Sequence, residues 1–350
     1  MRRSPLPKRL LKTLALRHPL SFLLALALYT LLAIYLLSPK IITVGEQELH
    51  FLSTDLDSST RASITHAIEE AKESVTLICY AIGDRHIIHA LKSAADRNVT
   101  VSLVYDPSAT LCADQLGPPI HAVARKSQGL MHHKLLVIDH KQVWLGSANM
   151  TPTSLSEHGN LMLAMHCSEL AQQIETLAHD LLTNSRVSLQ PLTLESNAQR
   201  FSLYIHPFHG RDSLSTLINK IDSARQRAFV AMYTFTHPQI VDALKRAHKR
   251  GVDVRVLFDK DSSRQTSKIA YQACKRAKIP CGYRTRKGLL HYKTALIDST
   301  LFTGSCNWTK AGFTKNDDAI FTIDPLLPEQ LRALESWWET VEHFSSIGTP

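Results

Sequence analysis

SVTLICYAIGDRHIIHALKSAADRNVTVSLVYD, residues 74–106, and RAFVAMYTFTHPQIVDALKRAHKRGVDVRVLFD, residues 227–259, are two copies of one sequence unit. They align without a gap at an offset of 153 residues, and 10 of the 33 positions are identical. The identities include Tyr80/Tyr233 and Asp106/Asp259 and are spread over the whole unit. Agreement of this extent between two parts of one chain indicates an internal repeat, so two similar lobes are expected.

Each copy is predicted to fold as a strand, a helix and a second strand. The short apolar runs at 75–80 and 228–233 indicate the first strands, and the β-branched runs at 99–105 and 252–258 indicate the second. Between them, apolar residues recur at helical spacing, and a further amphipathic helix is expected before each unit. Alternating strands and helices predict an α/β fold with largely parallel sheets covered by helices.

A second shared block follows each unit. MHHKLLVID at 131–139 leads to GSAN at 146–149, and LHYKTALID at 290–298 leads to GSCN at 304–307. Residues i and i+2 of a strand point to the same face, so His132 and Lys134 are predicted to share one face. His291 and Lys293 repeat that arrangement in the second half.

The remaining motif residues are predicted to lie at the ends of a hairpin. Asp139 and Asp298 have the opposite strand parity to the lysines, which favours a role in stabilising turns. In Gly-Ser-x-Asn, glycine permits a tight reversal, while serine and asparagine offer short polar groups. These residues are Gly146, Ser147 and Asn149 in the first copy and Gly304, Ser305 and Asn307 in the second. Five residues instead of six separate Asp298 from Gly304, which a shorter turn would absorb.

This set of side chains suits the chemistry of a phosphodiester. Lys134 and Lys293 would neutralise phosphoryl oxygens, and the two motif asparagines would donate hydrogen bonds to them. One imidazole can attack phosphorus while the other protonates the departing alkoxide. Because two lysines supply the positive charge, the predicted site requires no metal and no cofactor.

The doubled pattern His-x-Lys-x4-Asp followed by Gly-Ser-x-Asn resembles the HKD motif of the phospholipase D superfamily, and the resemblance covers roughly residues 45–345. It implies two pseudo-symmetric α/β/α lobes, an active site at their interface and a phosphohistidine intermediate. It further implies that His132 is the nucleophile and His291 the general acid, although near-symmetry leaves the reverse order open. Family members carry an acid about eleven residues past the motif asparagine that orients the histidine. Asp318 holds this place in the second half, whereas Asn160 occupies it in the first, so the partner of His132 is left open.

The N-terminus has the pattern of a membrane anchor. Six of the positive charges behind the formal net charge of +9 fall within the first 17 residues, and residues 20–37 that follow carry no charge, Gly or Pro. As a helix, 18 residues span about 27 Å, close to a bilayer core. The expected organisation is a basic cytoplasmic tail at 1–19, an uncleaved anchor at 20–37, a first lobe at 45–167, a linker helix at 168–198 and a second lobe at 199–345. The catalytic part would then lie on the extracytoplasmic side, with a cleaved signal or a buried helix as alternatives.

If the extracytoplasmic side is oxidising, Cys274 and Cys281 are the best candidates for a disulfide.

Three classes of function fit these features. The leading hypothesis is hydrolysis or transphosphatidylation of phospholipid head groups at a bilayer by a monomer that holds both half-sites; a cardiolipin synthase-like transferase is a variant of it. The alternative is a membrane-anchored endonuclease of the same superfamily, which the mild charge of the remaining chain disfavours. A binding protein with an inactive site is disfavoured because His, Lys, Ser and Asn are present in both copies.

Overall fold

The computed structural model describes residues 19–37, 41–45, 48–56, 59–110, 116–183, 189–196 and 198–347, and the chain divides into the compact units Met1–Lys40 and Ile41–Pro350. In the first unit, helix α2 spans Pro19–Leu37; most of the predicted basic tail lies outside the described residues. None of the helices in the described ranges combines the length and the apolar character needed to cross a membrane. The anchor at 20–37 therefore stays a prediction, as do the proposed boundaries of the lobes.

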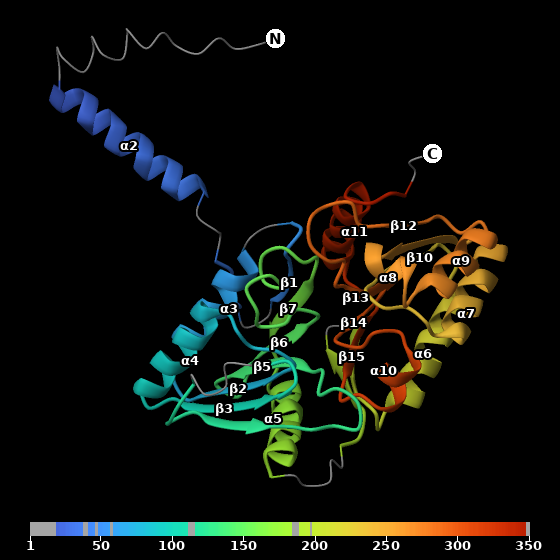
Figure 1. Ribbon diagram of the computed structural model, residues 1–350, viewed down its shortest axis with the longest axis horizontal. Coiled ribbons are helices and arrows are strands. Elements are labelled where there is room, and N and C mark those ends of the chain that lie inside the picture. The colour runs from blue at the N-terminus through green and yellow to red at the C-terminus, as the bar shows by residue number, and fades with distance from the viewer. Residues whose placement is uncertain are drawn as a thin grey trace. The chain divides into compact units, whose positions relative to one another are not determined.

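The second unit contains two mixed β-sheets, one from each half of the chain (Figure 1). The first sheet has the strand order β1-β7-β6-β5-β2-β3-β4, and the second has the order β12-β11-β10-β13-β14-β15-β9-β8. The strands of the first sheet are β1 (Leu49–Ser53), β2 (Ser74–Cys79), β3 (Thr100–Tyr105), β4 (His121–Ala124), β5 (Lys134–Ile138), β6 (Gln142–Gly146) and β7 (Leu161–His166). Those of the second are β8 (Leu192–Ser196), β9 (Gln199–Ile205), β10 (Arg227–Met232), β11 (Asp253–Phe258), β12 (Cys281–Tyr283), β13 (Lys293–Ile297), β14 (Thr300–Gly304) and β15 (Ala319–Asp324).

The prediction of largely parallel sheets was wrong. Among the strands of the described residues, only β2, β3 and β4, and likewise β10, β11 and β12, form parallel ladders, because helices or long segments connect them. The motif strands β5 and β6 follow each other through a short turn and must run antiparallel, as do β13 and β14. Strands β7 and β15 extend the antiparallel part of their sheets. The result is a mixed sheet in each half, whose centre is the motif strand.

Helices pack on these sheets and complete the core. They are α3 (Ser59–Glu69), α4 (Arg85–Asp96), α5 (Ser168–Leu182), α6 (Gly210–Ser223), α7 (Pro238–Lys249), α8 (Lys260–Arg264), α9 (Lys268–Arg276), α10 (Lys310–Thr314) and α11 (Pro328–His343). Helices α3 and α4 share one buried cluster with the first sheet, and α6, α7 and α9 share another with the second. A third cluster combines residues of both sheets with α5 and α11, which lie between the two halves in Figure 1. This shared core holds the two lobes together. Cys274 and Cys281 are free thiols, so the candidate disulfide is not formed.

Candidate active site

The motif hairpins place the two His-x-Lys pairs on equivalent strands. Lys134 is the first residue of β5 and Lys293 the first residue of β13, and each histidine lies two residues earlier. Residues 139–141 connect β5 to β6, whereas residues 298–299 connect β13 to β14. The one-residue difference between the motifs therefore falls in the turn and leaves both pairs in register.

The two motif aspartates support the hairpins from behind. Asp139 has a left-handed backbone (φ 50°), and its carboxylate accepts N–H groups of Lys72, Glu73 and Ser74 at 2.8–3.1 Å. Asp298 (φ 49°) accepts the N–H groups of residues 225–227 at 2.8–3.0 Å in the same way. These hydrogen bonds hold the pKa of both carboxyls below the ordinary value, against the opposing effect of burial. Both aspartates thus lie outside the group of catalytic side chains.

We expect Asp139→Ala to lower the free energy of unfolding by about 1–2 kcal/mol, because several backbone donors lose their acceptor. A carboxyl whose pKa is depressed on folding stabilises the protein above its unfolded pKa, so this contribution should vanish as the pH falls through the lower folded pKa. Denaturant titrations at pH 7 and pH 3 measure the difference, with Asp298→Ala as a matched variant. Loss of activity at unchanged stability would instead place Asp139 in the chemistry.

The two lobes exchange short backbone bridges at the site. The N–H of His132 donates to the carbonyl of Asp317 at 2.7 Å, and the N–H of Asp317 donates to Leu130 at 2.9 Å. In the same manner, His291 donates to Gly159 at 2.9 Å, and Gly159 donates to Leu289 at 2.8 Å. The segment before His132 therefore runs beside Asp317, the neighbour of Asp318, and the segment before His291 runs beside Gly159, the neighbour of Asn160.

These bridges orient each histidine from the other half of the chain. His132 Nδ1 lies 2.8 Å from Asp318 Oδ1, which also accepts a hydrogen bond from Ser305 Oγ at 2.7 Å. His291 Nδ1 lies 2.9 Å from Asn160 Oδ1, which accepts from Ser147 Oγ at 2.8 Å. In each case Nδ1 is occupied and Nε2 is left to face a substrate.

The crossed arrangement answers the question left open by the sequence. Asp318 does not orient the histidine of its own half, so His132 has a carboxylate partner after all. The histidine with the neutral partner is His291, because Asn160 comes from the first half. Sequence spacing alone could not reveal this, since the pairing depends on how the lobes dock.

Both motif serines and both motif glycines lie behind the histidines. The hydroxyl groups of Ser147 and Ser305 are buried and hold Asn160 and Asp318, and they also accept the N–H groups of Leu161 and Ala319. A Cβ atom on Gly146 or Gly304 would collide with the backbone of the neighbouring strand, at the carbonyl oxygens of residues 161 and 319. Only glycine allows the strands to approach so closely here.

The motif lysines are buried beneath the histidines. Lys134 Nζ donates to the carbonyl of His132 at 2.8 Å and lies 5.3 Å from the ring centroid of Tyr80. Lys293 Nζ donates to the carbonyl of His291 at 2.7 Å and lies 4.8 Å from the ring of Tyr233. The same tyrosine rings pack against the histidines, at centroid distances of 5.0 and 4.9 Å. Two amino groups are thus held close to each other at the lobe interface.

Burial and mutual repulsion shift these groups toward their neutral forms. Burial lowers the pKa of Lys134 to about 7, and burial with the nearby Lys134 charge lowers the pKa of Lys293 well below its usual value. Burial also lowers the pKa of both histidines, and more so for His291, whose neighbours Lys293, Lys134, His132 and His158 include no close carboxylate. Burial alone would raise the pKa of Asp318, but the charge and hydrogen bond of His132, the charge of Lys134 and the hydrogen bond of Ser305 together outweigh it, and the pKa falls to about 2. A bound phosphodiester anion would favour the protonated lysines and His291.

The motif asparagines lie at the edge of this group. The backbone N–H of Asn149 donates to Ser154 Oγ at 2.9 Å, and its side-chain Oδ1 accepts no hydrogen bond from the described residues. Asn307 Oδ1 accepts the N–H of Thr234 at 3.3 Å. Their amide NH₂ groups have no such protein partner among the contacts of the described residues, which suits donation to a phosphoryl oxygen.

Four site residues were not assigned a role from the sequence, although the repeat marked them. Tyr80 and Tyr233 pack on the histidines, as described above. Asp106 Oδ2 accepts the N–H of Met131 at 2.9 Å, and Asp259 Oδ2 accepts that of Leu290 at 3.0 Å, so each aspartate fixes the residue before a catalytic histidine. All four are identical positions in the aligned copies, which was the available signal.

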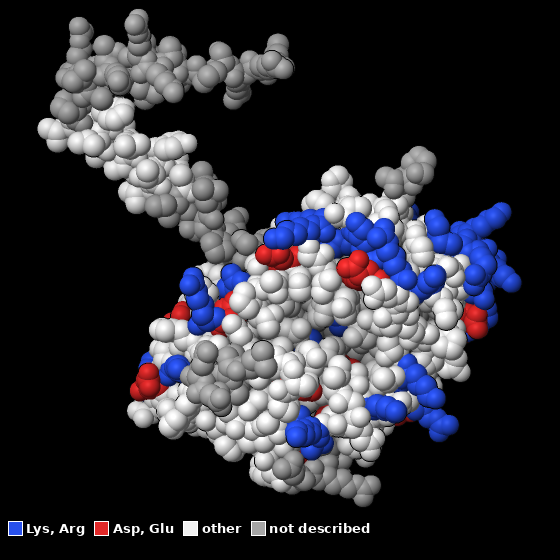
Figure 2. Space-filling model, in the orientation of Figure 1, with Lys and Arg blue, Asp and Glu red and all other residues white. Residues whose placement is uncertain are grey.

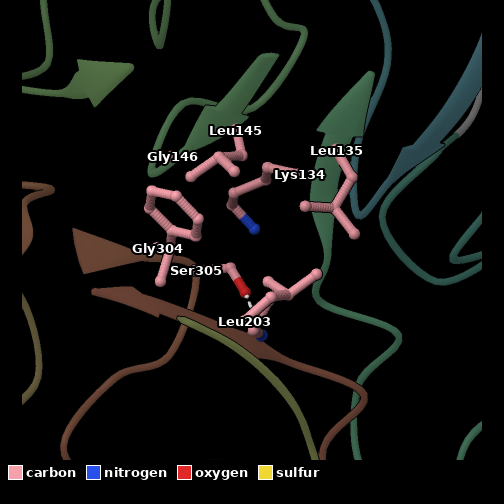
Figure 3. Close-up of a pocket in the computed structure, with 9 residues that line it drawn as sticks. Lys134, Leu135, Leu145, Gly146, Leu203, Gly304 and Ser305 are labelled. Carbon is pink, nitrogen blue, oxygen red and sulfur yellow. Dashed lines mark hydrogen bonds between the residues drawn. The ribbon is translucent and has the colours of Figure 1, made fainter. Parts of the chain in front are cut away.

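Figure 3 shows the seam between the lobes beside these groups, where Lys134 of one half points toward Ser305 of the other. Leucine side chains and the two motif glycines line the space, which does not admit a water molecule. It is therefore a packed joint, and the substrate must approach from the side of the histidine Nε2 atoms. Among the described residues, no three His, Cys, Asp or Glu side chains are grouped as metal ligands.

The fold and the two crossed half-sites define a phosphodiesterase-type enzyme of two fused lobes. The family described as "Cardiolipin synthase, PLD-like domain" matches residues 64–182 and 217–339, and the chain therefore belongs to the phospholipase D superfamily. This confirms the family predicted from the motifs, and the two mixed sheets agree with its two-lobed α/β fold.

Characterised relatives cover parts of the chain. It is 31% identical over 135 residues to the mitochondrial cardiolipin hydrolase of Homo sapiens, a match that spans 37% of this chain and 53% of that protein. It is 32% identical over 109 residues to a phospholipase D of Rickettsia felis, spanning 31% of this chain and 54% of that one. The chain thus spans about half the length of the curated relatives it matches. The structure of phosphatidylserine synthase from Haemophilus influenzae superposes with a TM-score of 0.67 at 13% identity, covering 88% of this chain and 89% of that one, which shows a shared fold.

Proposed function

We propose that the chain is a membrane-associated phospholipase D-type enzyme that transfers the phosphatidyl group of a phospholipid to water or to an alcohol. The observation that carries this proposal is the crossed pair of His-x-Lys sites at one lobe interface, with unequal partners for the two histidines. The similarity to enzymes named cardiolipin hydrolase and phospholipase D supports a lipid phosphodiester as the substrate. The apolar segment at 20–37 would hold the catalytic domain at a bilayer, on the extracytoplasmic side.

In the proposed first step, His132 Nε2 attacks phosphorus and the bond to the head-group oxygen breaks. His291 Nε2 donates its proton to that oxygen, so the head group leaves as a neutral alcohol. Asp318 supports His132 in this role, because its carboxylate stabilises the positive charge that the imidazole ring gains as the phosphohistidine forms. Asn160 is neutral and leaves His291 a stronger acid.

In the second step, water or an alcohol attacks the phosphohistidine while His291 takes up its proton. This returns both histidines to their initial forms and completes the balance of atoms. Lys134 and Lys293 stabilise the charge on the phosphoryl oxygens, helped by Asn149 and Asn307. Hydrolysis and transfer differ only in the acceptor, so both belong to the same proposal.

A side-by-side assay of the full-length protein tests the substrate class. We expect release of head group from phosphatidylglycerol, cardiolipin or phosphatidylcholine vesicles, and no cleavage of single-stranded DNA. The His132→Ala variant is the control for contaminating activity. Cleavage of DNA without any lipid turnover would contradict the lipid proposal and leave the phosphodiesterase chemistry intact.

We also expect the activity to withstand EDTA, because the lysines supply the positive charge that a metal ion would bring. The measurement compares initial rates with and without the chelator on a water-soluble phosphodiester, where divalent ions do not alter vesicle surfaces. Loss of the rate in EDTA and its return on adding a divalent ion would contradict this mechanism.

A further inference from the structure

The two lobes share a fold but carry very different charge. Residues 199–345 contain 23 Lys and Arg against 14 Asp and Glu, whereas residues 45–167 contain 9 against 13. The small net charge of the folded part is therefore the sum of a basic second lobe and a mildly acidic first lobe. Figure 2 shows Lys and Arg gathered along one edge of the catalytic unit, over the region where Figure 1 labels α9, α11 and β12.

Much of this excess lies in a segment that interrupts the repeat. Residues 260–280, which contain α8 and α9, carry six basic residues and one acidic residue, while the equivalent residues 107–120 of the first half carry only Asp114. The basic residues are Lys260, Arg264, Lys268, Lys275, Arg276 and Lys278, all of them exposed. The segment thus has a formal net charge of +5, six basic residues less one acidic, whereas its equivalent in the first half has −1.

The segment is attached to the active-site region at two points, one before α8 and one before α9. Asp259, directly before α8, holds the N–H of Leu290 beside His291. Ser267, directly before α9, accepts the N–H of Phe235 at 2.9 Å, two residues beyond the Tyr233 that packs on His291. A ligand on α8 and the first turn of α9 would therefore lie next to the catalytic face of the second lobe.

An exposed aliphatic side chain projects from this basic surface. Ile269, the second residue of α9, is 80% exposed between Lys268 and the other cations. Surfaces for single-stranded nucleic acid combine cations with free aromatic faces. Here the nearby Tyr283 ring is occupied by Lys260 and Arg264, at 6.0 and 5.8 Å from its centroid. Cations around an exposed aliphatic residue instead match the head-group and acyl layers of an anionic bilayer.

We propose that the α8–α9 segment of the second lobe docks the catalytic domain onto an anionic phospholipid bilayer, with Ile269 entering the head-group layer. The proposal rests on the lipid function proposed above. It adds which surface of the protein contacts the bilayer and that the bilayer lipids are anionic. Each Lys or Arg near an anionic bilayer strengthens binding roughly fivefold. The surface would bring His132 and His291 to the phosphodiester of a lipid within the bilayer.

A fluorophore placed on α9 tests the contact directly in the full-length protein, independently of binding by the N-terminal segment. An environment-sensitive dye is attached at Ile269→Cys, with Cys112 and Cys167 replaced by Ser, and a matched protein carries the dye at Lys92→Cys on α4 of the first lobe. With phosphatidylcholine vesicles that contain phosphatidylglycerol, we expect a blue shift and quenching by lipid-borne quenchers at position 269 only. An unchanged spectrum at 269, or equal changes at both positions, would overturn the proposal.

Charge reversal supplies the second measurement. We expect Lys268→Glu/Lys275→Glu/Lys278→Glu to raise KM for phosphatidylglycerol vesicles about 100-fold or more, with kcat on water-soluble bis(p-nitrophenyl) phosphate unchanged. The matched variant Lys72→Glu/Lys92→Glu/Lys141→Glu makes the same change of net charge in the first lobe and should leave KM nearly unaltered. If the wild type turns over neither substrate, the proposed function fails. If the wild type and both triple variants turn over the two substrates with equal KM, the docking surface is refuted while the proposed function stands. If the α8–α9 variant binds an oligodeoxynucleotide more weakly but is unchanged on vesicles, the surface is assigned to nucleic acid.

Discussion

His291→Ala should release one equivalent of p-nitrophenolate from a phosphatidyl-p-nitrophenol substrate and then stop, whereas His132→Ala should release none. A p-nitrophenolate leaves without a proton, so the first step no longer needs the acid at position 291. The phosphohistidine then accumulates because no base activates water. With an ordinary alkoxide head group, His291→Ala should lower kcat by about 10²–10⁴-fold, and loss of the nucleophile in His132→Ala should remove turnover altogether.

The burst and the trapped intermediate are measured together. Stopped-flow absorbance gives the size of the burst per active site, and mass spectrometry of the acid-labile adduct locates the phosphatidyl group on the residue-132 side of the repeat. His121→Ala is a suitable control, since this exposed histidine lies on the edge strand β4 and belongs to neither half-site. A burst in His132→Ala and none in His291→Ala would reverse the assigned roles, and a burst in neither would exclude a covalent histidine intermediate.

Asp318→Asn should lower kcat by about 10²–10⁴-fold while the fold is kept. The substitution preserves size but removes the only carboxylate that meets a catalytic histidine among the described residues. An amide at this position can hold His132 in the wrong tautomer and cannot stabilise the positive charge of the phosphohistidine. The rate of the burst with the p-nitrophenyl substrate reports this step, and an unaltered burst rate would exclude the role of Asp318 in the attack.

The converse variant, Asn160→Asp, should act on pH dependence more than on the maximal rate. His291 must be protonated to act as the acid, and its pKa is lowered by burial and by the charges of Lys293 and Lys134. A carboxylate at position 160 would raise that pKa, so the alkaline limb of the kcat/KM profile should move to higher pH. The profile should be corrected for folded protein, because Asn160 Nδ2 donates to the carbonyl of Ser154 at 2.9 Å and an aspartate oxygen cannot. An unmoved alkaline limb, or movement of the acidic limb, would contradict the assignment of His291 as the acid.

The two variants differ in what they test. Asp318→Asn gives both histidines a neutral partner, and Asn160→Asp gives both a carboxylate partner. In each variant the two half-sites have equal partners, as in a fully symmetric duplication. Their comparison therefore isolates the difference between the halves from the chemistry common to both. If exchanging both residues in one protein restored activity with the burst assigned to His291, the choice of nucleophile would lie in these two positions.

Much of this protein was readable from its sequence because the information is local. The alternation of strand residues predicted a common face for each histidine and its lysine, and the repeat offset identified the two halves. The same repeat marked Tyr80, Tyr233, Asp106 and Asp259 before any role could be given to them. The spacing of residues within a strand and the identities between the two copies can be recognised without knowing which strands pair.

Other features were decided only by the tertiary structure. Beyond the local motif hairpins, the antiparallel part of each sheet is extended by the pairing of β7 with β1 and of β15 with β9, segments more than 100 residues apart. The crossed contacts of His132 with Asp318 and of His291 with Asn160 join residues 186 and 131 positions apart. Likewise, Arg284 lies in a basic stretch before the second motif, and only the tertiary structure buries it in an ion pair with Asp55 of the other lobe. Local preferences act over a few residues, whereas these contacts arise from the packing of two separate cores. The sequence by itself thus determined the family, the repeat and the catalytic residue types, and the docking of the lobes decided which partner each histidine received.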